Sequence, residues 1–195
     1  MTLFHPQAAA FRTQVEQLFH PGVISFIYTP TEQLKTLSLS YTQAFLAAGC
    51  AKAFALIDQE ETGIVPYLSV EANLLINGKA ASLNRLAPAL RNDAAFLAQS
   101  ATQLNPAQSL YVQFFRGLLG DRQVILMNDF PASMDIQEIR LFLNTATAAL
   151  HQGPSRLVIL TADENLITAH PDTSWSEAPS LTPTTAKRGQ DIIHR

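Results

Sequence analysis

Four short runs of β-branched and aliphatic residues recur along the chain, and longer segments with helical periodicity separate them. The runs cover residues 23–28, 53–57, 123–127 and 157–161. A short continuous apolar run is typical of a strand that is buried on both faces, and strands that alternate with helices favour a parallel sheet. We therefore expect these four strands to lie in one mainly parallel sheet, with helices on both of its faces.

The segments between the runs predict the helices. The clearest one covers 136–151, where apolar residues recur at helical spacing. Ligands of open parallel sheets bind beyond the carboxyl ends of the strands. The candidate site therefore comprises the loops that follow the four strands, at 29–36, 58–66, 128–135 and 161–165.

Composition and charge exclude several classes of function. The net charge of −3 leaves no broad positive face, so nucleic acid is not an expected partner. Hydrophobic residues make up 47% and charged residues 15%, so either a partner covers part of the surface or Ala and Leu are scattered over it. The single cysteine, Cys50, fits a reducing compartment, and the five histidines show no metal-ligand spacing. The longest apolar stretch, 44–57, is too short to span a bilayer, and we expect a cytoplasmic protein.

The C-terminal segment differs in composition from the rest of the chain. Residues 172–185 contain nine Ser, Thr or Pro residues in fourteen. Such a segment has little apolar surface to bury in return for its ordering entropy. We therefore expect a single domain over residues 1–171 and a loosely ordered tail over 172–195.

The loop after the first strand has the layout of a phosphate-binding loop (Walker A). The pattern G-x-x-x-x-G-K-S/T ends in a Lys-Ser/Thr pair that opens a helix, and Lys35-Thr36 holds that place here. Thr29 and Leu34 stand at the two glycine positions. Glycine lets backbone N–H groups approach the phosphates at positive φ, which Thr and Leu do not favour. By itself this is a weak match.

Further motifs follow in order. Residues 104–108, LNPAQ, stand where a signature LSGGQ would be, and 116–121, RGLLGD, match the end of the helix that follows it. Asn128-Asp129-Phe130-Pro131 ends the third strand in place of Asp-Glu-Pro (Walker B), and 133–135 form a loop one residue short of the usual length. Upstream, 56–60 resemble a Q-loop and 66–74 a P-x-L-S/T-V-x-E-N-L segment.

These motifs together, over about residues 20–165, resemble the ATP-binding domain of ATP-binding-cassette (ABC) transporters. The resemblance implies a three-layer α/β domain of the P-loop NTPase type. Only 24 positions separate Lys35 from Gln59, where the family has a small antiparallel sheet with adenine contacts. We therefore expect that antiparallel subdomain to be reduced or missing.

The resemblance also implies candidate nucleotide-binding residues. ATP and Mg²⁺ would be held by Lys35, Thr36, Gln59 and Asp129. The catalytic residues are replaced, because Phe130 stands at the glutamate that serves as general base and Ala162 at the switch histidine, and Pro106-Ala107 replace signature glycines. We expect no catalytic residues, no metal-ligand cluster, and Mg-ATP binding weaker than millimolar or none.

The expected function is a degenerate, non-catalytic ABC-type subunit. Its partner would be a membrane permease, a catalytic ABC ATPase or both, which would place it at the cytoplasmic face of the membrane without insertion into it. The family's Q-loop region receives the permease, and the corresponding residues here are Gln59, Tyr67, Leu68 and Val70. Two alternatives stay open: a weak ATP-binding or ATP-hydrolysing subunit, and a soluble interaction module on the same fold.

Overall fold

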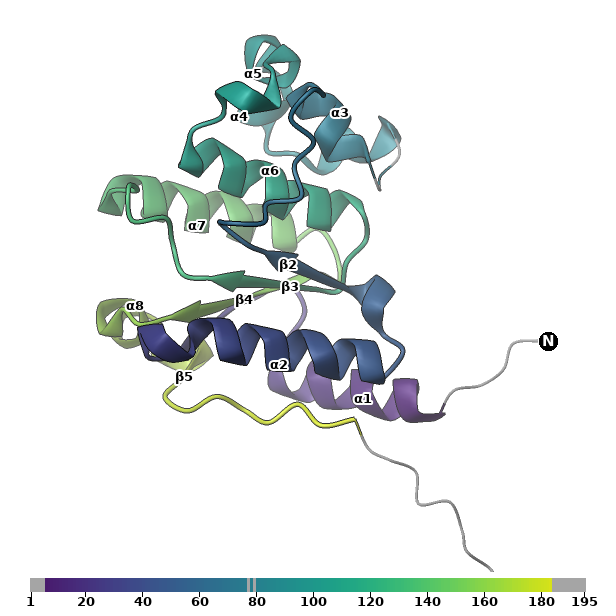
Figure 1. The fold of residues 1–195 in the computed structure, drawn as a ribbon, viewed down its shortest axis with the longest axis vertical. Coiled ribbons are helices and arrows are strands. Elements are labelled where there is room, and N and C mark those ends of the chain that lie inside the picture. Colours follow the sequence, from purple (N-terminus) through teal and green to yellow (C-terminus); the bar gives the residue numbers. More distant parts are fainter. Residues whose placement is uncertain (1–5, 77, 79, 184–195) are drawn as a thin grey trace, which may run out of the picture.

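A five-stranded parallel sheet forms the centre of the protein in the computed structural model, which describes residues 6–76, 78 and 80–183 (Figure 1). The strand order is β2-β3-β4-β1-β5, and every pair of neighbouring strands is parallel. The predicted sheet of four strands is confirmed, with a short fifth strand added. The strands are β1 (Ile24–Tyr28), β2 (Phe54–Ile57), β3 (Val124–Asn128), β4 (Arg156–Thr161) and β5 (Ser174–Trp175).

Antiparallel pairing in the described ranges is limited to one isolated bridge, between Ser69 and Ser100. The antiparallel subdomain is therefore missing from the described part of the chain, as expected. The segment between β1 and β2 holds only a 3₁₀ turn (Thr31–Gln33), helix α2 (Leu34–Ala47) and a second 3₁₀ turn (Ala51–Ala53).

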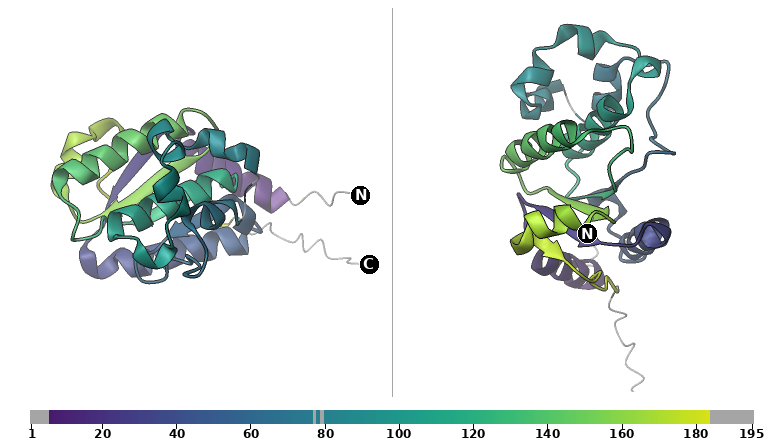
Figure 2. Two further views of the ribbon diagram at one scale, coloured as in Figure 1. Left: turned by 90° about the horizontal axis from the view of Figure 1, so that it is seen from above. Right: turned by 90° about the vertical axis from the view of Figure 1, so that its left-hand side faces the viewer.

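Helices cover both faces of the sheet (Figures 1 and 2). One face carries α1 (Pro6–Leu18) and α2, and the opposite face carries α6 (Pro106–Leu119) and α7 (Ile136–Leu150). Three short helices lie beyond α6, farther from the sheet, and α8 lies beside β1. These are α3 (Val70–Leu75), α4 (Pro88–Arg91), α5 (Ala94–Ala98) and α8 (Glu164–Ala169). No helix among the described residues is both long and apolar enough to cross a membrane.

Each face of the sheet builds its own hydrophobic core. Along β3, Ile125 and Met127 pack toward α6 and α7, whereas Val124 and Leu126 pack toward α1 and α2. Both sets are almost fully buried, which explains why the strand is a continuous apolar run. The core beside α6 and α7 contains a chain of aromatic contacts through Phe114, Phe115, Phe130 and Phe142.

The sheet register brings the carboxyl ends of the central strands together. Asn128 lies opposite Leu160, and Tyr28 lies opposite Thr161. The loops after β1, β2, β3 and β4 therefore meet at one edge, as the strand pattern predicts.

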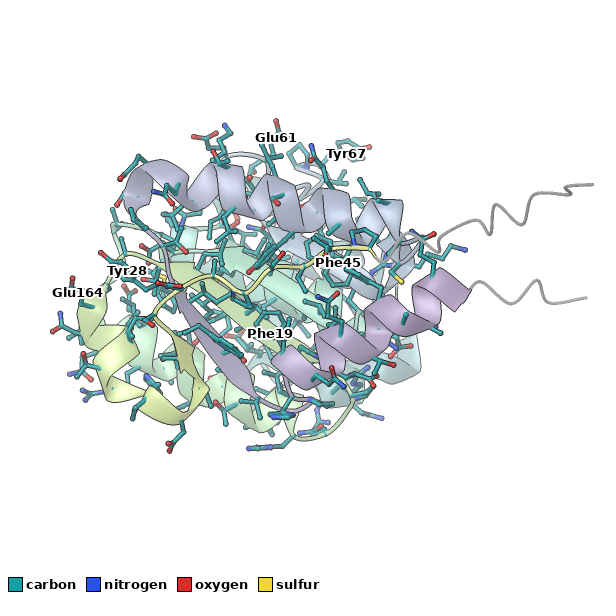
Figure 3. All side chains as sticks on the ribbon, turned by 90° about the horizontal axis from the view of Figure 1, so that it is seen from below. Phe19, Tyr28, Phe45, Glu61, Tyr67 and Glu164 are labelled. Carbon is teal, nitrogen blue, oxygen red and sulfur yellow. The ribbon has the colours of Figure 1, made fainter. Side chains whose placement is uncertain are left out.

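Part of the expected C-terminal tail packs against the domain, so the predicted start of the loose tail at 172 differs from the structure. Ser174 and Trp175 pair with Phe26 and Ile27 of β1. Residues 176–183, here called the strap, then cross between α1 and α2 (Figure 3). The Tyr41 hydroxyl donates to the Pro179 carbonyl over 2.7 Å, and Leu181 is buried. Residues 184–195 lie outside the described residues.

Candidate functional site

The loop after β1 is a compact turn in which three backbone N–H groups, those of Thr29, Gln33 and Leu34, are bonded within the chain. Thr29 is buried, and its N–H donates to the Thr161 carbonyl over 2.9 Å. In the 3₁₀ turn that follows, Gln33 N–H donates to the Pro30 carbonyl over 2.8 Å and Leu34 N–H donates to Thr31. A phosphate-binding loop turns such N–H groups toward the anion. Here they stabilise the turn itself.

Lys35 and Thr36 point to different places. The Lys35 ammonium lies 3.4 Å from the Glu60 carboxylate on the loop after β2, and both side chains are largely exposed. Thr36 instead lines a cavity whose other wall is formed by residues 176–178 of the strap. The two side chains therefore lie in different surroundings, Lys35 beside Glu60 and Thr36 beside the strap.

The polar contact between α2 and the end of β3 is made by Ser38, two residues beyond Thr36. The Asn128 amide donates to the buried Ser38 hydroxyl over 3.3 Å, and that hydroxyl donates to the Lys35 carbonyl over 3.0 Å. The Asn128 side-chain oxygen is buried, and the described residues offer it no hydrogen-bond partner.

Asp129 lies just beyond β3 in a left-handed conformation, with φ of 26°. Its carboxylate accepts bonds from the Phe130 N–H (2.8 Å), the Thr161 hydroxyl (3.0 Å) and the Ala162 N–H (3.4 Å). Gln59 reaches the same place, because its side-chain amide donates to the Asp129 backbone carbonyl over 3.1 Å. Gln59 and Asp129 are thus brought together as expected, although the Asp129 carboxylate is held by the loop after β4.

The end of β3 also revises the alignment of the Asp-Glu-Pro motif. β3 ends at Asn128, so aligning the two strand ends would place Asn128-Asp129 at Asp-Glu, one residue earlier than the sequence-based placement at Asp129-Phe130. With the motif placed one residue earlier, the loop that ends at Asp135 has the family's usual length and is no longer one residue short. Phe130 is a core residue whose ring lies 5.9 Å from that of Phe142. In that alignment Asn128 would replace the strand-end aspartate of the motif, and Asp129 would stand at its glutamate.

The start of α6, which corresponds to the signature motif, is closed by its own residues. The Asn105 side chain accepts from Gln108 N–H over 2.8 Å, and the Gln108 side chain accepts from Asn105 N–H over 3.1 Å. Pro106 at the first helical position has no N–H to offer. A helix start capped in this way offers few free donors to an anion.

Of the four predicted docking residues, three are accessible and one is buried. The Tyr67 side chain is 86% exposed, Gln59 is exposed and Leu68 is partly exposed. Val70 is 0% exposed, because it begins α3 and faces the core. Val70 therefore does not belong to a docking surface.

Two anchors that the sequence did not single out hold the loop that carries Tyr67. Asn73, 0% exposed, accepts from Val65 N–H over 2.7 Å and donates to the carbonyls of Val65 and Ser69, each over 3.0 Å. The Arg116 guanidinium donates to the carbonyls of Gly63 (2.6 Å) and Thr62 (2.8 Å). Burial lowers the pKa of Arg116 from its usual value. Their places in the predicted P-x-L-S/T-V-x-E-N-L and RGLLGD segments were the only sequence signals.

The described residues contain no group of three or more His, Cys, Asp or Glu side chains that could hold a metal ion. A bound Mg-ATP would need free backbone donors, a lysine aimed at the phosphates and an open strand-end carboxylate. Three N–H groups of the turn after β1, those of Thr29, Gln33 and Leu34, are bonded within the chain, the Lys35 ammonium lies near Glu60, and β3 ends at Asn128.

Comparison with known proteins shows what this fold resembles. No family model and no curated protein matches the sequence. An ATP-binding subunit of an ABC transporter superposes with a TM-score of 0.56 at 14% identity, over 78% of this chain and 72% of that chain. A nucleotide-free ATP-binding cassette gives 0.58 at 14% identity, covering 82% and 78%.

A third similar structure is cbiO1 from Clostridium perfringens, part of the ABC transporter complex cbiONQ. It gives a TM-score of 0.61 at 11% identity, over 77% of this chain and 71% of that chain. The chain therefore has the fold of the ATP-binding domains of ABC transporters, the P-loop NTPase type that the sequence predicted.

Proposed function

We propose that this protein is a degenerate, non-catalytic ABC-type subunit that works by docking onto a transporter partner. The partner is a membrane permease, a catalytic ABC ATPase or both, and the protein would lie in the cytoplasm, peripheral to the membrane. The fold supports the ABC assignment. The observation that supports the non-catalytic part is the turn after β1, where the N–H groups of Gln33 and Leu34 are bonded internally while the side chains of Lys35 and Thr36 diverge.

The size of the loss supports this proposal. A hydrogen bond to a charged oxygen contributes about 1.5–3 kcal/mol. Millimolar affinity corresponds to only about 4 kcal/mol. The N–H groups of Gln33 and Leu34 are both withdrawn into the turn, and losing two such bonds removes most of a millimolar affinity. We therefore expect Mg-ATP to bind more weakly than millimolar or not at all.

The segment that corresponds to the signature motif, at the start of α6, supports weak ATP binding in a dimer as well. In this family ATP is held between the phosphate loop of one subunit and the signature of the other. The capping box at Asn105 and Gln108 leaves the start of α6 with few donors for a partner's nucleotide. In a heterodimer with a catalytic ATPase, the ATP site formed by the partner's phosphate loop and this chain's signature segment would then not work.

The loop around Tyr67 supports docking. A large, exposed aromatic side chain on a loop fixed by Asn73 and Arg116 can bury apolar area on a partner with little loss of loop entropy. Figure 3 shows Tyr67 at the rim of the molecule beyond α2. Gln59 and Leu68 extend this surface.

Co-purification tests the docking proposal. Tyr67→Asp and Leu68→Asp should each abolish co-purification with a permease encoded beside this gene, while circular dichroism stays that of the folded protein. Leu141→Asp is the matched control, since Leu141 is 62% exposed on α7. If both loop variants retain the partner, or if the control loses it equally, docking through this loop is wrong.

Calorimetry with ATP, with and without Mg²⁺, tests the non-catalytic part. Micromolar binding by the unmodified protein would overturn it. The weak-ATPase alternative has one observation in its favour, which is that Asp129 stands at the glutamate position. Phosphate release above background that disappears in Asp129→Asn would support that alternative.

A further inference from the structure

A cavity of about 620 Å³ lies between the turn after β1 and the strap. Small-molecule sites in proteins have volumes of roughly 300–1,000 Å³. The cavity is also at the carboxyl end of β1, where ligands of open parallel sheets bind. Tyr28 and Thr29 line it from the strand end, and Ser176, Glu177 and Ala178 line it from the strap.

The lining of this cavity has a distinct chemistry. Five lining residues carry a hydroxyl, and one side-chain amide and one carboxylate join them on a surface that is otherwise mainly apolar; the described residues that line the cavity include no Lys, Arg or His. The Thr29 hydroxyl already donates to the Ile27 carbonyl. The hydroxyls belong to Tyr28, Thr29, Thr36, Ser40 and Ser176, the amide to Gln33 and the carboxylate to Glu177, with Pro30, Leu37 and Ala178 as apolar surface. Hydroxyls and amides both donate and accept hydrogen bonds.

The same lining disfavours phosphates. Phosphate recognition uses cationic side chains or convergent backbone N–H groups. Lys35 is turned toward Glu60, and the N–H groups of Gln33 and Leu34 are bonded within the turn. Glu177 adds a charge of the wrong sign.

We infer that this cavity binds a small, uncharged ligand rich in hydroxyl groups, a class that free sugars and nucleosides share. Tyr28 supplies an aromatic surface on which the apolar face of a ring can pack. The surrounding hydroxyls, Gln33 and Glu177 supply the hydrogen-bond partners. This site is separate from the Tyr67 loop and does not depend on the docking proposal.

The protein carries its own reporter for this site. Trp175 is the only tryptophan and directly precedes Ser176 of the cavity wall. The full chain is titrated with glucose, galactose, adenosine and uridine, each beside its monophosphate, by tryptophan fluorescence and by calorimetry. For at least one neutral compound, the change in fluorescence and the heat of binding should reach saturation. The monophosphate of that compound should bind about fivefold more weakly because Glu177 repels its charge. Glu177→Gln should narrow that difference.

A matched pair of variants tests whether the ligand binds in this cavity. Ser40→Phe fills the cavity from α2, whereas Gln43→Phe adds the same ring at an exposed position of α2 outside the lining. Binding should be lost in Ser40→Phe and kept in Gln43→Phe and Tyr67→Asp. Absence of saturation with all four neutral compounds, tighter binding of a monophosphate, or unchanged binding in a folded Ser40→Phe would each overturn the inference. Partner docking would be unaffected by any of these results.

Discussion

Removing the Asn73 side chain should release the loop that presents Tyr67. Asn73 is fully buried on α3 and ties the loop through one accepted bond, from Val65 N–H, and donated bonds to the carbonyls of Val65 and Ser69. A fourth, longer bond reaches the Leu68 carbonyl over 3.4 Å. Asn73→Ala deletes all four and leaves the Val65 N–H without this partner.

The expected loss follows from these bonds. A buried intramolecular hydrogen bond contributes about 1 kcal/mol net, and an orphaned buried donor costs about 1–3 kcal/mol. The three shorter bonds therefore set the loss in free energy of unfolding at about 2–4 kcal/mol. In a chain of this size each kcal/mol lowers Tm by roughly 2–4 °C, so the shift is roughly 4–16 °C.

Thermal melts and amide hydrogen exchange measure the two parts of this prediction. Exchange at Val65 should accelerate more than exchange in strand β4, because the loop opens before the sheet does. Asn144→Ala on the exposed face of α7 is the matched control and should leave Tm within about 2 °C. A Tm unchanged in Asn73→Ala, together with unchanged protection of Val65, would refute the anchoring role.

Three further predictions test the site and the strap. Phe130→Glu should give no phosphate release from ATP and should lower the free energy of unfolding by about 3 kcal/mol or more, measured by urea melts, because Phe130 packs on Phe142. Thr29→Gly with Leu34→Gly should tighten Mg-ATP binding in calorimetry, because glycine lets the turn open; an unchanged titration would show that Lys35 cannot be recruited. Burial raises the pKa of Tyr41 above its ordinary value of 10. The stabilisation by the neutral phenol is therefore complete below about pH 10 and is lost as the pH rises beyond it, so wild type should lose stability in alkali more steeply than Tyr41→Phe.

The strands were predictable because a strand that is buried on both faces is a continuous run of apolar residues in the sequence. Val124 to Met127 and Leu157 to Leu160 are continuous apolar runs, and the two cores account for them residue by residue. Helix α7 was equally clear, since apolar residues recur along it at helical spacing, and the structure adds a capping box of Asp135 and Glu138 at its start.

The details of the site were not predictable, because they depend on how a short loop turns. Lys35-Thr36 keeps its place in the sequence, yet the 3₁₀ turn before α2 presents Ser38 to Asn128 and leaves Thr36 facing the strap. The end of β3 was uncertain for a similar reason. Both Asn128 and Asp129 are polar, and only the pairing of Asn128 with Leu160 shows where the strand stops.

Long-range contacts explain the two other differences. Val70 is an apolar residue in a mixed segment, and only the packing of α3 on α6 shows that it faces inward. The strap has the composition of a loose tail, but Tyr41 bonds to Pro179, a residue 138 positions away, and Leu181 enters the core beside α1 and α2. Local composition does not report such partners.

Several polar groups at the carboxyl edge of the sheet are bonded within the chain, and the buried Asn128 side-chain oxygen is an exception among the described residues. A ligand site leaves donors and carboxylates free for the ligand, and the unliganded protein bears the cost of those unpaired groups. Here the N–H groups of Gln33 and Leu34, the Asp129 carboxylate and the start of α6 are all bonded within the chain. Under the proposed function, these internal bonds would stabilise the domain without nucleotide. A subunit built in this way would hold its Tyr67 loop in one conformation whether or not ATP is present, which is what a constitutive docking subunit requires.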